Sequence, residues 1–494
     1  MIDVNKLLDI LLYHKDDPLL LNSAFFLNYF AAFLLCYLAV SRSKEGRVAV
    51  FTIFSLFFFY KACGMFVGLV ILSAIVDFNL SRWIYQSEDD RKRKGLLILS
   101  IVLNLGLLFY FKYTDFFIGI INQVSDGDIP LLKLMLPIGI SFYTFENLSY
   151  TVDVYRKEFK PVDSFMDYLF FLSFFPKLMM GPIVRAHDFI PQIDKPYELN
   201  SEDIGKGMYL IMAGLFKKMV ISDFIYQNFV QYIFDDPSKH TGLECLLGVY
   251  GYALIIYCDF SGYSDIAIGI ARWTGFKIPP NFDSPYQSSN ITEFWRRWHI
   301  SLSSWLRDYL YIPLGGNRKG KFRQYINLGL TMLIGGFWHG ANWNFIFWGA
   351  MHGGALAVDK VRLDWLKKCG GGATGWMGNV LKVGGVIVTF HFVCFCWVFF
   401  KASTFQDAWN LLHQVAFDFQ PEVWLELYNG YTAVFWVMLL GFILHFLPKR
   451  TEIFTEQTLS KVPVLANVAI MVIFFWILIQ VKSSETMMPI YLQF

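Results

Sequence analysis

The sequence predicts an all-α membrane protein that crosses the bilayer many times, and three observations carry this prediction. Of its 494 residues, 55% are hydrophobic and only 17% are charged, whereas soluble chains usually carry about 25% charged residues. Apolar runs long enough to cross a membrane recur along the chain. They are far longer than barrel strands and do not alternate, and backbone amides cannot stay unpaired in hydrocarbon, so each run is expected to be a helix.

The apolar runs predict about ten or eleven crossings, by the rule of roughly 20 residues per span. One further segment, 48–79, is too long for one span and short for two, and it carries Lys61 near its middle. The clear runs are residues 22–40, 95–111, 131–150, 165–181, 246–273, 325–357, 380–400, 431–447 and 464–481.

The distribution of charge predicts the topology. Residues 1–21 hold two lysines against four aspartates, whereas three basic residues follow the first span, which predicts an N-terminus outside. If 48–79 is a hairpin, the basic cluster 91–94 returns to the cytoplasm and the acidic stretch 112–130 lies outside, so a hairpin is expected. The first run lacks a cleavage pattern and is expected to be a retained anchor. No linker or internal repeat stands out, so residues 1–494 are expected to form one membrane-embedded domain.

The apolar pattern is broken in the middle of the chain, at 278–323, by a segment rich in aromatic residues. Large apolar side chains recur there in steps of three and four, and polar ones fall mainly on the other side, which predicts one amphipathic helix. Asn290 and Glu293 suit its N-terminal cap. Such a helix commonly lies flat at a membrane interface, where His299 at the edge of the face would be a solvated polar residue. The apolar side has Trp295, Trp298, Leu302, Trp305 and Tyr309, and the polar side has Arg296, Arg297, Ser303, Arg307 and Asp308.

His339 lies inside an apolar run, and this position suggests function. A central charged residue costs about 2.5–3.5 kcal/mol on insertion scales, so ionisable groups in spans usually line a cavity. A neutral histidine escapes much of this cost and can act as a general base. If the run is one helix, Asn342 lies one turn beyond His339, whereas His352 lies about 220° around the axis. His352 is therefore expected to serve helix packing beside Gly349 and Gly353.

A second polar island lies at 258–271, where Asp259 and Asp265 flank Ser261, Tyr263 and Ser264 inside an apolar run. Two carboxylates in a membrane helix suggest either a hydrated cavity or ion pairs. The arginines expected as partners are Arg272, Arg296 and Arg297.

The sequence lacks the motifs of several other classes of enzyme. It has no Walker phosphate loop, no His-Glu-x-x-His zinc helix and no Gly-x-Ser-x-Gly elbow. The Gly-rich stretch 313–320 follows an amphipathic helix, so it is expected to be a basic turn. Seven scattered cysteines suggest small buried residues, with neither a disulfide framework nor a metal site. The net charge of +2 gives no indication of a nucleic-acid partner.

Four sequence blocks together resemble the membrane-bound O-acyltransferase family. Within it they are similar to the bacterial branch that O-acetylates alginate, and 180–352 is the expected motif-bearing core. The resemblance implies a helical fold enclosing a tunnel, which an acyl thioester enters from the cytoplasm and a hydroxyl acceptor from the other side. The blocks are GLFKKMVISD (214–223), CDFSGYSDIAIGIA (258–271), NFDSPYQSSNITEFWRRWHISLSSWLRDYLYIPLGGNRKG (281–320) and GGFWHGANWNFIFWGAMHG (335–353).

The resemblance also implies site residues. The histidine of the family's Trp-His-Gly motif corresponds to His339, and that of its Arg-Trp-His-x-Ser-Leu motif to His299. His339 is expected to be a general base, although an acyl-imidazole remains an alternative. Asn342 or the Trp338 indole is expected to stabilise the oxyanion. Candidates lining the tunnel are Asp259, Ser261, Ser264, Asp265, Trp295, Trp298, Ser303, Trp305, Trp338 and Asn342. The sequence also contains a basic surface on the cytoplasmic side. It is expected either to attract the donor's phosphates or to reflect only the positive-inside bias. Its residues are Arg296, Arg297, Arg307, Arg318, Lys319, Lys321 and Arg323.

The expected function is transfer of an acetyl group toward an extracytoplasmic polysaccharide, an alginate-like exopolysaccharide or cell-wall glycan. The donor is expected to be acetyl-CoA or an acyl carrier, and a periplasmic SGNH-type acetyltransferase the partner, at the bacterial inner membrane. Within the family, the alternative is D-alanyl transfer from a carrier protein. From another class, the alternative is a transporter that binds a proton or solute at Asp259, Asp265 and His339, although the inverted repeats of many transporters are not seen.

Overall fold

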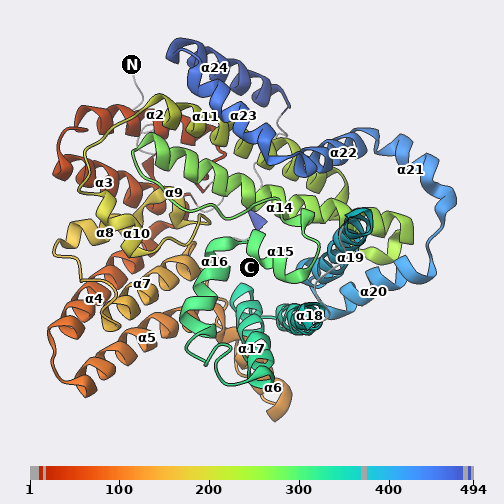
Figure 1. Cartoon of the computed structure of the whole chain (residues 1–494), viewed down its shortest axis with the longest axis horizontal. Helices are drawn as coiled ribbons and strands as arrows, with labels where there is room; N and C mark the ends of the chain where they lie inside the picture. Colours follow the sequence, from red (N-terminus) through yellow and green to blue (C-terminus); the bar gives the residue numbers. More distant parts are fainter. Residues whose placement is uncertain (1–10, 15–17, 369–374, 482–487, 491–494) are drawn as a thin grey trace. The chain divides into compact units, whose positions relative to one another are not determined.

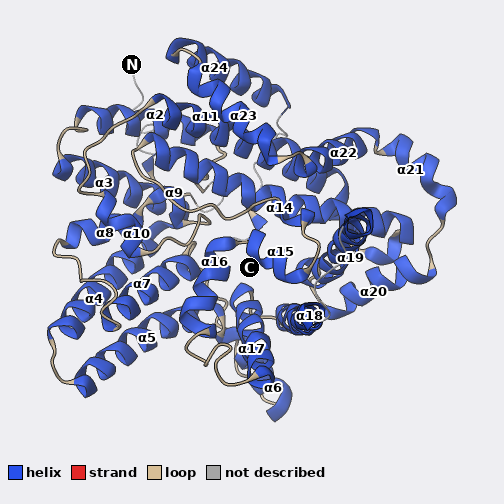
Figure 2. Cartoon of the chain, viewed as in Figure 1, coloured by secondary structure: helices blue, strands red, loops and turns tan. Residues whose placement is uncertain are grey.

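The computed structural model describes residues 11–14, 18–368, 375–481 and 488–490. Every regular element in these ranges is helical and none is a strand (Figures 1 and 2). The all-α prediction is therefore confirmed. Most of the acidic segment that predicts an external N-terminus lies outside the described residues, and that orientation stays a prediction.

The chain divides into two compact units. The first comprises Met1–Gly207 and Ile266–Pro279, and the second comprises Met208–Asp265 and Pro280–Phe494. The boundary passes through α11 (Ser201–Leu215) and α14 (Gly242–Trp273). A single domain with a core at 180–352 stays a prediction.

In the first unit, a buried polar network joins α4, α5 and α7. Asp77 of α4 accepts hydrogen bonds from Ser100 (2.5 Å), Asn104 (2.7 Å) and Thr151 (3.3 Å). Buried polar groups need partners, so this network fixes how the three helices pack. The unit contains α2 (Ala24–Ala39), α3 (Lys44–Cys63), η1 (Gly64–Phe66), α4 (Val67–Gln86), α5 (Asp90–Lys112), α6 (Thr114–Ser125), α7 (Ile140–Tyr155), α8 (Phe165–Ser173), α9 (Phe175–Leu178), α10 (Ala186–Phe189) and η2 (Ile190–Gln192).

The ambiguous segment 48–79 forms two helices, α3 and α4, which a short 3-10 turn connects. Gly64 ends α3 with φ of 64°, a left-handed conformation that glycine adopts readily. By length and composition, the 43 residues Lys44–Gln86 qualify together as one candidate span. The break lies near the middle of the segment, but the expected hairpin and the number of crossings made by this segment stay predictions.

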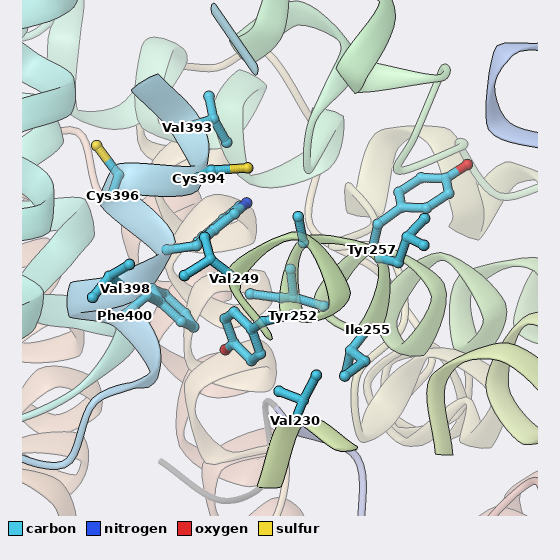
Figure 3. Packing of buried hydrophobic residues seen from close by; sticks show 14 of the residues in the cluster. Val230, Val249, Tyr252, Ile255, Tyr257, Val393, Cys394, Cys396, Val398 and Phe400 are labelled. Atoms are coloured by element: carbon cyan, nitrogen blue, oxygen red, sulfur yellow. The ribbon is translucent and has the colours of Figure 1, made fainter. Parts of the chain in front are cut away.

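The second unit is built around α14 and α19, whose apolar side chains contribute to one buried cluster. Figure 3 shows Val249 and Tyr252 of α14 near residues of α19 such as Cys394 and Phe400. The remaining elements of the unit are η3 (Phe216–Ser222), α12 (Asp223–Ile225), η4 (Tyr226–Val230), α13 (Gln231–Asp235), η5 (Pro237–Lys239), η6 (Pro285–Gln287), α15 (Ile291–Arg297), α16 (Ile300–Leu306), η7 (Arg307–Tyr311), α17 (Lys321–His339), α18 (Trp343–Lys368), α19 (Gly375–Lys401), α20 (Phe405–Phe417), η8 (Pro421–Val423), α21 (Trp424–Gly430), α22 (Thr432–Phe446), α23 (Lys449–Lys461) and α24 (Val464–Val481).

Fewer helices are long and apolar enough to cross a membrane than the ten or eleven crossings predicted. Within the described ranges, four qualify, or five if the pair 421–430 and 432–446, bent by 97°, is one span. The difference arises because several apolar runs are divided. Run 165–181 contains the short helices α8 and α9, and run 325–357 contains α17 and α18. Several helices still qualify, so the chain is a multi-pass membrane protein.

Helices α17 and α18 lie side by side and form a tight antiparallel pair (Figure 1). Small residues allow the close approach, because a Cβ at Gly349 would lie 2.5 Å from the carbonyl oxygen of Met332 and 3.2 Å from Cα of Gly336. A Cβ at Gly353 would lie 3.0 Å from Cα of Gly329. The expected packing role of Gly349 and Gly353 is therefore confirmed.

Replacement of Gly349 by alanine is expected to destabilise the protein by about 1–3 kcal/mol, because the new methyl group meets the backbone of α17. The thermal unfolding midpoint of the detergent-solubilised protein measures the effect. Gly354→Ala is the matched control, because a Cβ at Gly354 of the same helix meets no atom within 4 Å. Equal midpoints for the two variants would contradict the close packing.

Candidate functional site

His339 is the last residue of α17, and its side chain is only 5% exposed. Its ring lies among three aromatic rings, with centroid distances of 4.9 Å to Trp338, 5.2 Å to Trp348 and 5.3 Å to Phe400. Gly340 follows with an extended backbone, and a Cβ there would lie 2.2 Å from the Phe345 ring. The chain therefore turns at Gly340, and the imidazole is held in an apolar, aromatic environment.

His299 is fully buried and contacts a polar network. Its Nδ1 lies 3.4 Å from the amide oxygen of Asn281, which also accepts a 2.6 Å hydrogen bond from the Ser301 hydroxyl. The Asn281 amide nitrogen donates to the Ser264 hydroxyl at 3.2 Å. Burial lowers the pKa of His299 to about 3, so its ring is neutral at physiological pH. The expectation of a solvated His299 is wrong.

The single amphipathic helix predicted for the central segment is also wrong, because the chain breaks at His299. Two short helices, α15 and α16, flank the break, and His299 has φ of 43° in the left-handed region. Three side chains of the predicted apolar face are nevertheless buried, namely Trp295, Trp298 and Trp305. The Asn290 side chain accepts a hydrogen bond from the Glu293 backbone, which confirms the cap. The Glu293 carboxylate reaches the backbone N–H of Ser289 instead of closing the capping box.

The break brings the two candidate histidines to the same tryptophan. The ring of Trp338 lies 6.4 Å from that of His299 and 4.9 Å from that of His339, between centroids. The three residues come from two segments about 40 residues apart in the sequence. This arrangement places two buried imidazoles next to one indole.

The two carboxylates of the 258–271 island are paired with lysines and not with the expected arginines. Asp259 lies 2.6 Å from the Lys218 amine, which also lies 2.7 Å from Asp223. Asp265 lies 2.6 Å from the Lys217 amine. Both lysines belong to η3, a π-helical turn. The prediction of ion pairs is confirmed, but its partners were wrong.

Asp259 has a further contact with the end of the chain. Its second carboxylate oxygen accepts a 2.7 Å hydrogen bond from the backbone N–H of Ile490. Ser261 and Ser264 of the same helix are buried, and the Ser264 hydroxyl accepts a hydrogen bond from Asn281, which also contacts His299. Asp259 and Asp265 therefore connect α14 to η3. Ser264 is linked to His299 through the side chain of Asn281.

A cavity of about 270 Å³ lies beside α15, η7, α17 and α18. Its lining contains three of the predicted site residues and two cations. The lining includes Trp295, Ser303, Arg307, Tyr311, Gln324 and Lys360. The Arg307 guanidinium pairs with the Asp308 carboxylate at 2.7 Å. The cavity therefore has a mainly apolar lining that includes two cationic side chains, Arg307 and Lys360.

The other predicted basic residues do not line this cavity. Arg297 pairs with Glu293 at 2.8 Å, and Lys321 pairs with Asp364 at 2.9 Å. Arg296, Arg318, Lys319 and Arg323 are exposed. The stretch 313–320 forms turns before α17, as predicted.

Asn342 caps a helix and does not share one with His339. Its side-chain oxygen accepts from the backbone N–H of Asn344 at 3.1 Å, and its amide donates to the carbonyl of Ser403 at 3.3 Å. The next residue, Trp343, is 59% exposed. The prediction that Asn342 lies one turn beyond His339 on the same helix is wrong because α17 ends at His339. The oxyanion role of Asn342 stays a prediction.

Several residues of the site escaped the sequence analysis. Trp348 and Phe400 contact His339, Asn281 contacts His299, and Lys217 and Lys218 pair with the carboxylates. Lys217, Lys218 and Asn281 lie inside the sequence blocks that resemble the family, and this position is the signal that could have identified them. Phe400 had no local signal. Among the described residues, no three His, Cys, Asp or Glu side chains gather as metal ligands.

Comparison with known proteins identifies the family. A sequence model of the membrane-bound O-acyltransferase family matches residues 149–401. The peptidoglycan O-acetyltransferase of Helicobacter pylori is 37% identical over 384 residues, which cover 72% of this chain and 71% of the relative. The probable alginate O-acetylase AlgI of Pseudomonas aeruginosa is 43% identical over 334 residues, 67% of this chain and 61% of the relative.

A more distant similarity extends over most of another enzyme. The teichoic acid D-alanyltransferase of Bacillus subtilis is 30% identical over 373 residues, which cover 70% of this chain and 92% of the relative. All three relatives transfer an acyl group according to their names, which sets the transporter alternative aside. The chain belongs to the membrane-bound O-acyltransferase family and is a membrane O-acyltransferase.

Proposed function

We propose that the protein transfers an acetyl group from a cytoplasmic thioester toward the hydroxyl groups of an extracytoplasmic polysaccharide, by way of a periplasmic SGNH-type acetyltransferase. The observation that supports this most directly is the pair of buried histidines, His339 and His299, in contact with Trp338. A neutral imidazole in an apolar environment suits proton abstraction from a hydroxyl.

In the proposed reaction, His339 is the general base. Its ring nitrogen takes the proton of the attacking hydroxyl while a C–O bond forms at the thioester carbonyl, and the C–S bond then breaks to release the thiolate. The proton passes from His339 to the thiolate, which leaves as a thiol. The aromatic rings around His339 exclude water, which limits hydrolysis of the donor and strengthens local electrostatics.

His299 and Trp338 have supporting roles in this proposal. His299 is neutral, and its Nδ1 is held at Asn281, so the ring is oriented before substrate enters. Trp338 offers an indole N–H near both imidazoles, which suits stabilisation of the oxyanion. Trp298 and Trp305 support the wall formed by the central segment. An acyl-imidazole on His339 remains the alternative chemistry.

The cavity beside α15 and α17 suits the donor side. Arg307 and Lys360 carry the positive charge that attracts the phosphates of acetyl-CoA or of an acyl carrier's phosphopantetheine arm. Exposed Arg296, Arg318 and Lys319, with paired Arg297, would add long-range attraction. We further propose that the protein lies in the bacterial inner membrane with its N-terminus outside, and that an SGNH-type acetyltransferase receives the acetyl group.

Acetyl is favoured over D-alanyl by the comparisons. The two O-acetylating relatives are 37% and 43% identical, whereas the D-alanyltransferase is 30% identical. D-Alanyl transfer is retained as the second candidate because that similarity spans 92% of the relative's length.

Expression in a bacterial host whose own relative is deleted, but whose SGNH-type acetyltransferase is retained, tests the proposal. Mild alkali releases ester-linked groups from the washed extracytoplasmic polysaccharide, and both acetate and D-alanine are measured in the same hydrolysate. The proposal expects acetate to rise and D-alanine to stay at the background of the empty vector. A rise in D-alanine alone would replace it with the second candidate, and no rise in either would reject both.

A further inference from the structure

His352 of α18 lies in a box of four aromatic rings. Its centroid distances are 6.2 Å to Phe294, 5.1 Å to Trp295, 4.7 Å to Trp348 and 5.6 Å to Phe392. The side chain is fully buried. A polar ring enclosed in this way is costly unless it makes a specific hydrogen bond.

That hydrogen bond comes from Trp295. Its indole N–H donates to Nδ1 of His352 at 3.2 Å. Only a neutral imidazole can accept at Nδ1, and its proton then lies on Nε2. Nε2 is buried and makes no hydrogen bond to any described residue. His352 therefore serves as an acceptor for Trp295 and not as a charged group.

The two tryptophans of the box face different parts of the site. Trp295 lines the 270 Å³ cavity, together with Ser303 and Arg307. Trp348 packs edge-on against His339 at 5.2 Å. His352 contacts both, so it connects the wall of the cavity with the aromatic support of His339.

We infer that His352 is a positioning residue for acyl transfer: it holds the Trp295 indole as a fixed wall of the cavity. This inference rests on the proposed function. It goes beyond the packing role expected for His352, because packing needs only the shape of the ring, whereas positioning needs the acceptor atom at Nδ1. Loss of the acceptor leaves a buried indole N–H without a partner, so the ring is expected to turn and change the shape of the cavity.

Three variants distinguish the effect of the hydrogen-bond acceptor at His352 from the effect of the shape of its ring. His352→Phe keeps a planar ring without an acceptor, and His352→Asn keeps an amide oxygen near the position of Nδ1. Trp295→Phe removes the donor and keeps an aromatic wall. The full chain is expressed in the host described above, and the initial rate of ester formation on the polysaccharide is divided by the amount of folded protein in the membrane.

His352→Phe and Trp295→Phe are each expected to lower this rate about tenfold. The double variant is expected to be no worse than either single one, because both remove the same hydrogen bond. His352→Asn is expected to stay within threefold of the unmodified protein. His413→Phe, on the exposed side of α20, is the control for the same chemical change and is expected to have no effect.

The outcomes distinguish this inference from the proposed function. Equal rates for His352→Asn and His352→Phe, or multiplicative losses in the double variant, would overturn the positioning role. His339→Ala in the same experiment tests the proposed chemistry separately. Full activity of His339→Ala would reject the proposed base, whereas the comparison of the two His352 variants would still report on the role of the acceptor.

Discussion

Replacement of His339 by alanine is expected to lower the rate of acyl transfer roughly 10²–10⁴-fold, the usual contribution of a general base. The substitution removes the only imidazole at the end of α17 and leaves the surrounding Trp338, Trp348 and Phe400 in place. The rate of ester formation on the polysaccharide measures the effect, and the amount of protein in the membrane shows that the variant inserts normally.

Two controls make this result specific. His413→Ala removes an exposed imidazole of α20 and is expected to leave the rate unchanged. Addition of free imidazole to membranes of the His339→Ala variant is expected to restore part of the activity if the site needs a base. A rate within threefold of the unmodified protein for His339→Ala would reject the assignment of His339.

Replacement of Lys218 by methionine is expected to destabilise the protein by about 3–5 kcal/mol, because it leaves two buried carboxylates without their cation. Lys218 is 6% exposed, and its amine lies 2.7 Å from Asp223 and 2.6 Å from Asp259. Methionine has a similar length and keeps most of the apolar packing. The thermal unfolding midpoint of the solubilised protein measures the loss.

The matched control is Lys321→Met, which removes an exposed ion pair with Asp364. The Lys321 side chain is 61% exposed, so its loss is expected to cost less than about 1 kcal/mol. The double variant Lys218→Met with Asp259→Asn is expected to recover part of the stability, because it neutralises one unpaired carboxylate. Similar midpoints for Lys218→Met and Lys321→Met would contradict a structural role for the buried cluster.

The fold class followed from the sequence because long apolar runs leave helices as the main solution in a membrane. The local break at His299 did not follow, because the spacing of Trp295, Trp298 and Leu302 continues the helical period across it. A left-handed residue that is not glycine gives no signal in such a pattern. The break matters for the site, because it buries His299 against Asn281.

The candidate site was only partly predictable for a second reason. His339 was conspicuous because an imidazole inside an apolar run is costly. The partners of Asp259 and Asp265 could not be predicted, because composition does not show which of several cations pairs with a given carboxylate. Lys217 and Lys218 are adjacent in the sequence, yet each pairs with a different aspartate of α14. Similarly, the turn after His339 separates Asn342 and His352 from the helix that an unbroken apolar run suggested.

The end of α17 at His339 has an electrostatic consequence. The aligned peptide dipoles of a helix place partial negative charge at its C-terminus, which stabilises a nearby cation by about 0.3–1 kcal/mol and by up to about 2 kcal/mol when partly buried. His339 is the final residue of a 19-residue helix. In the proposed reaction, the imidazolium therefore forms where the backbone itself lowers its energy. The turn at Gly340 thus fixes both the position of the base and the field in which it receives its proton.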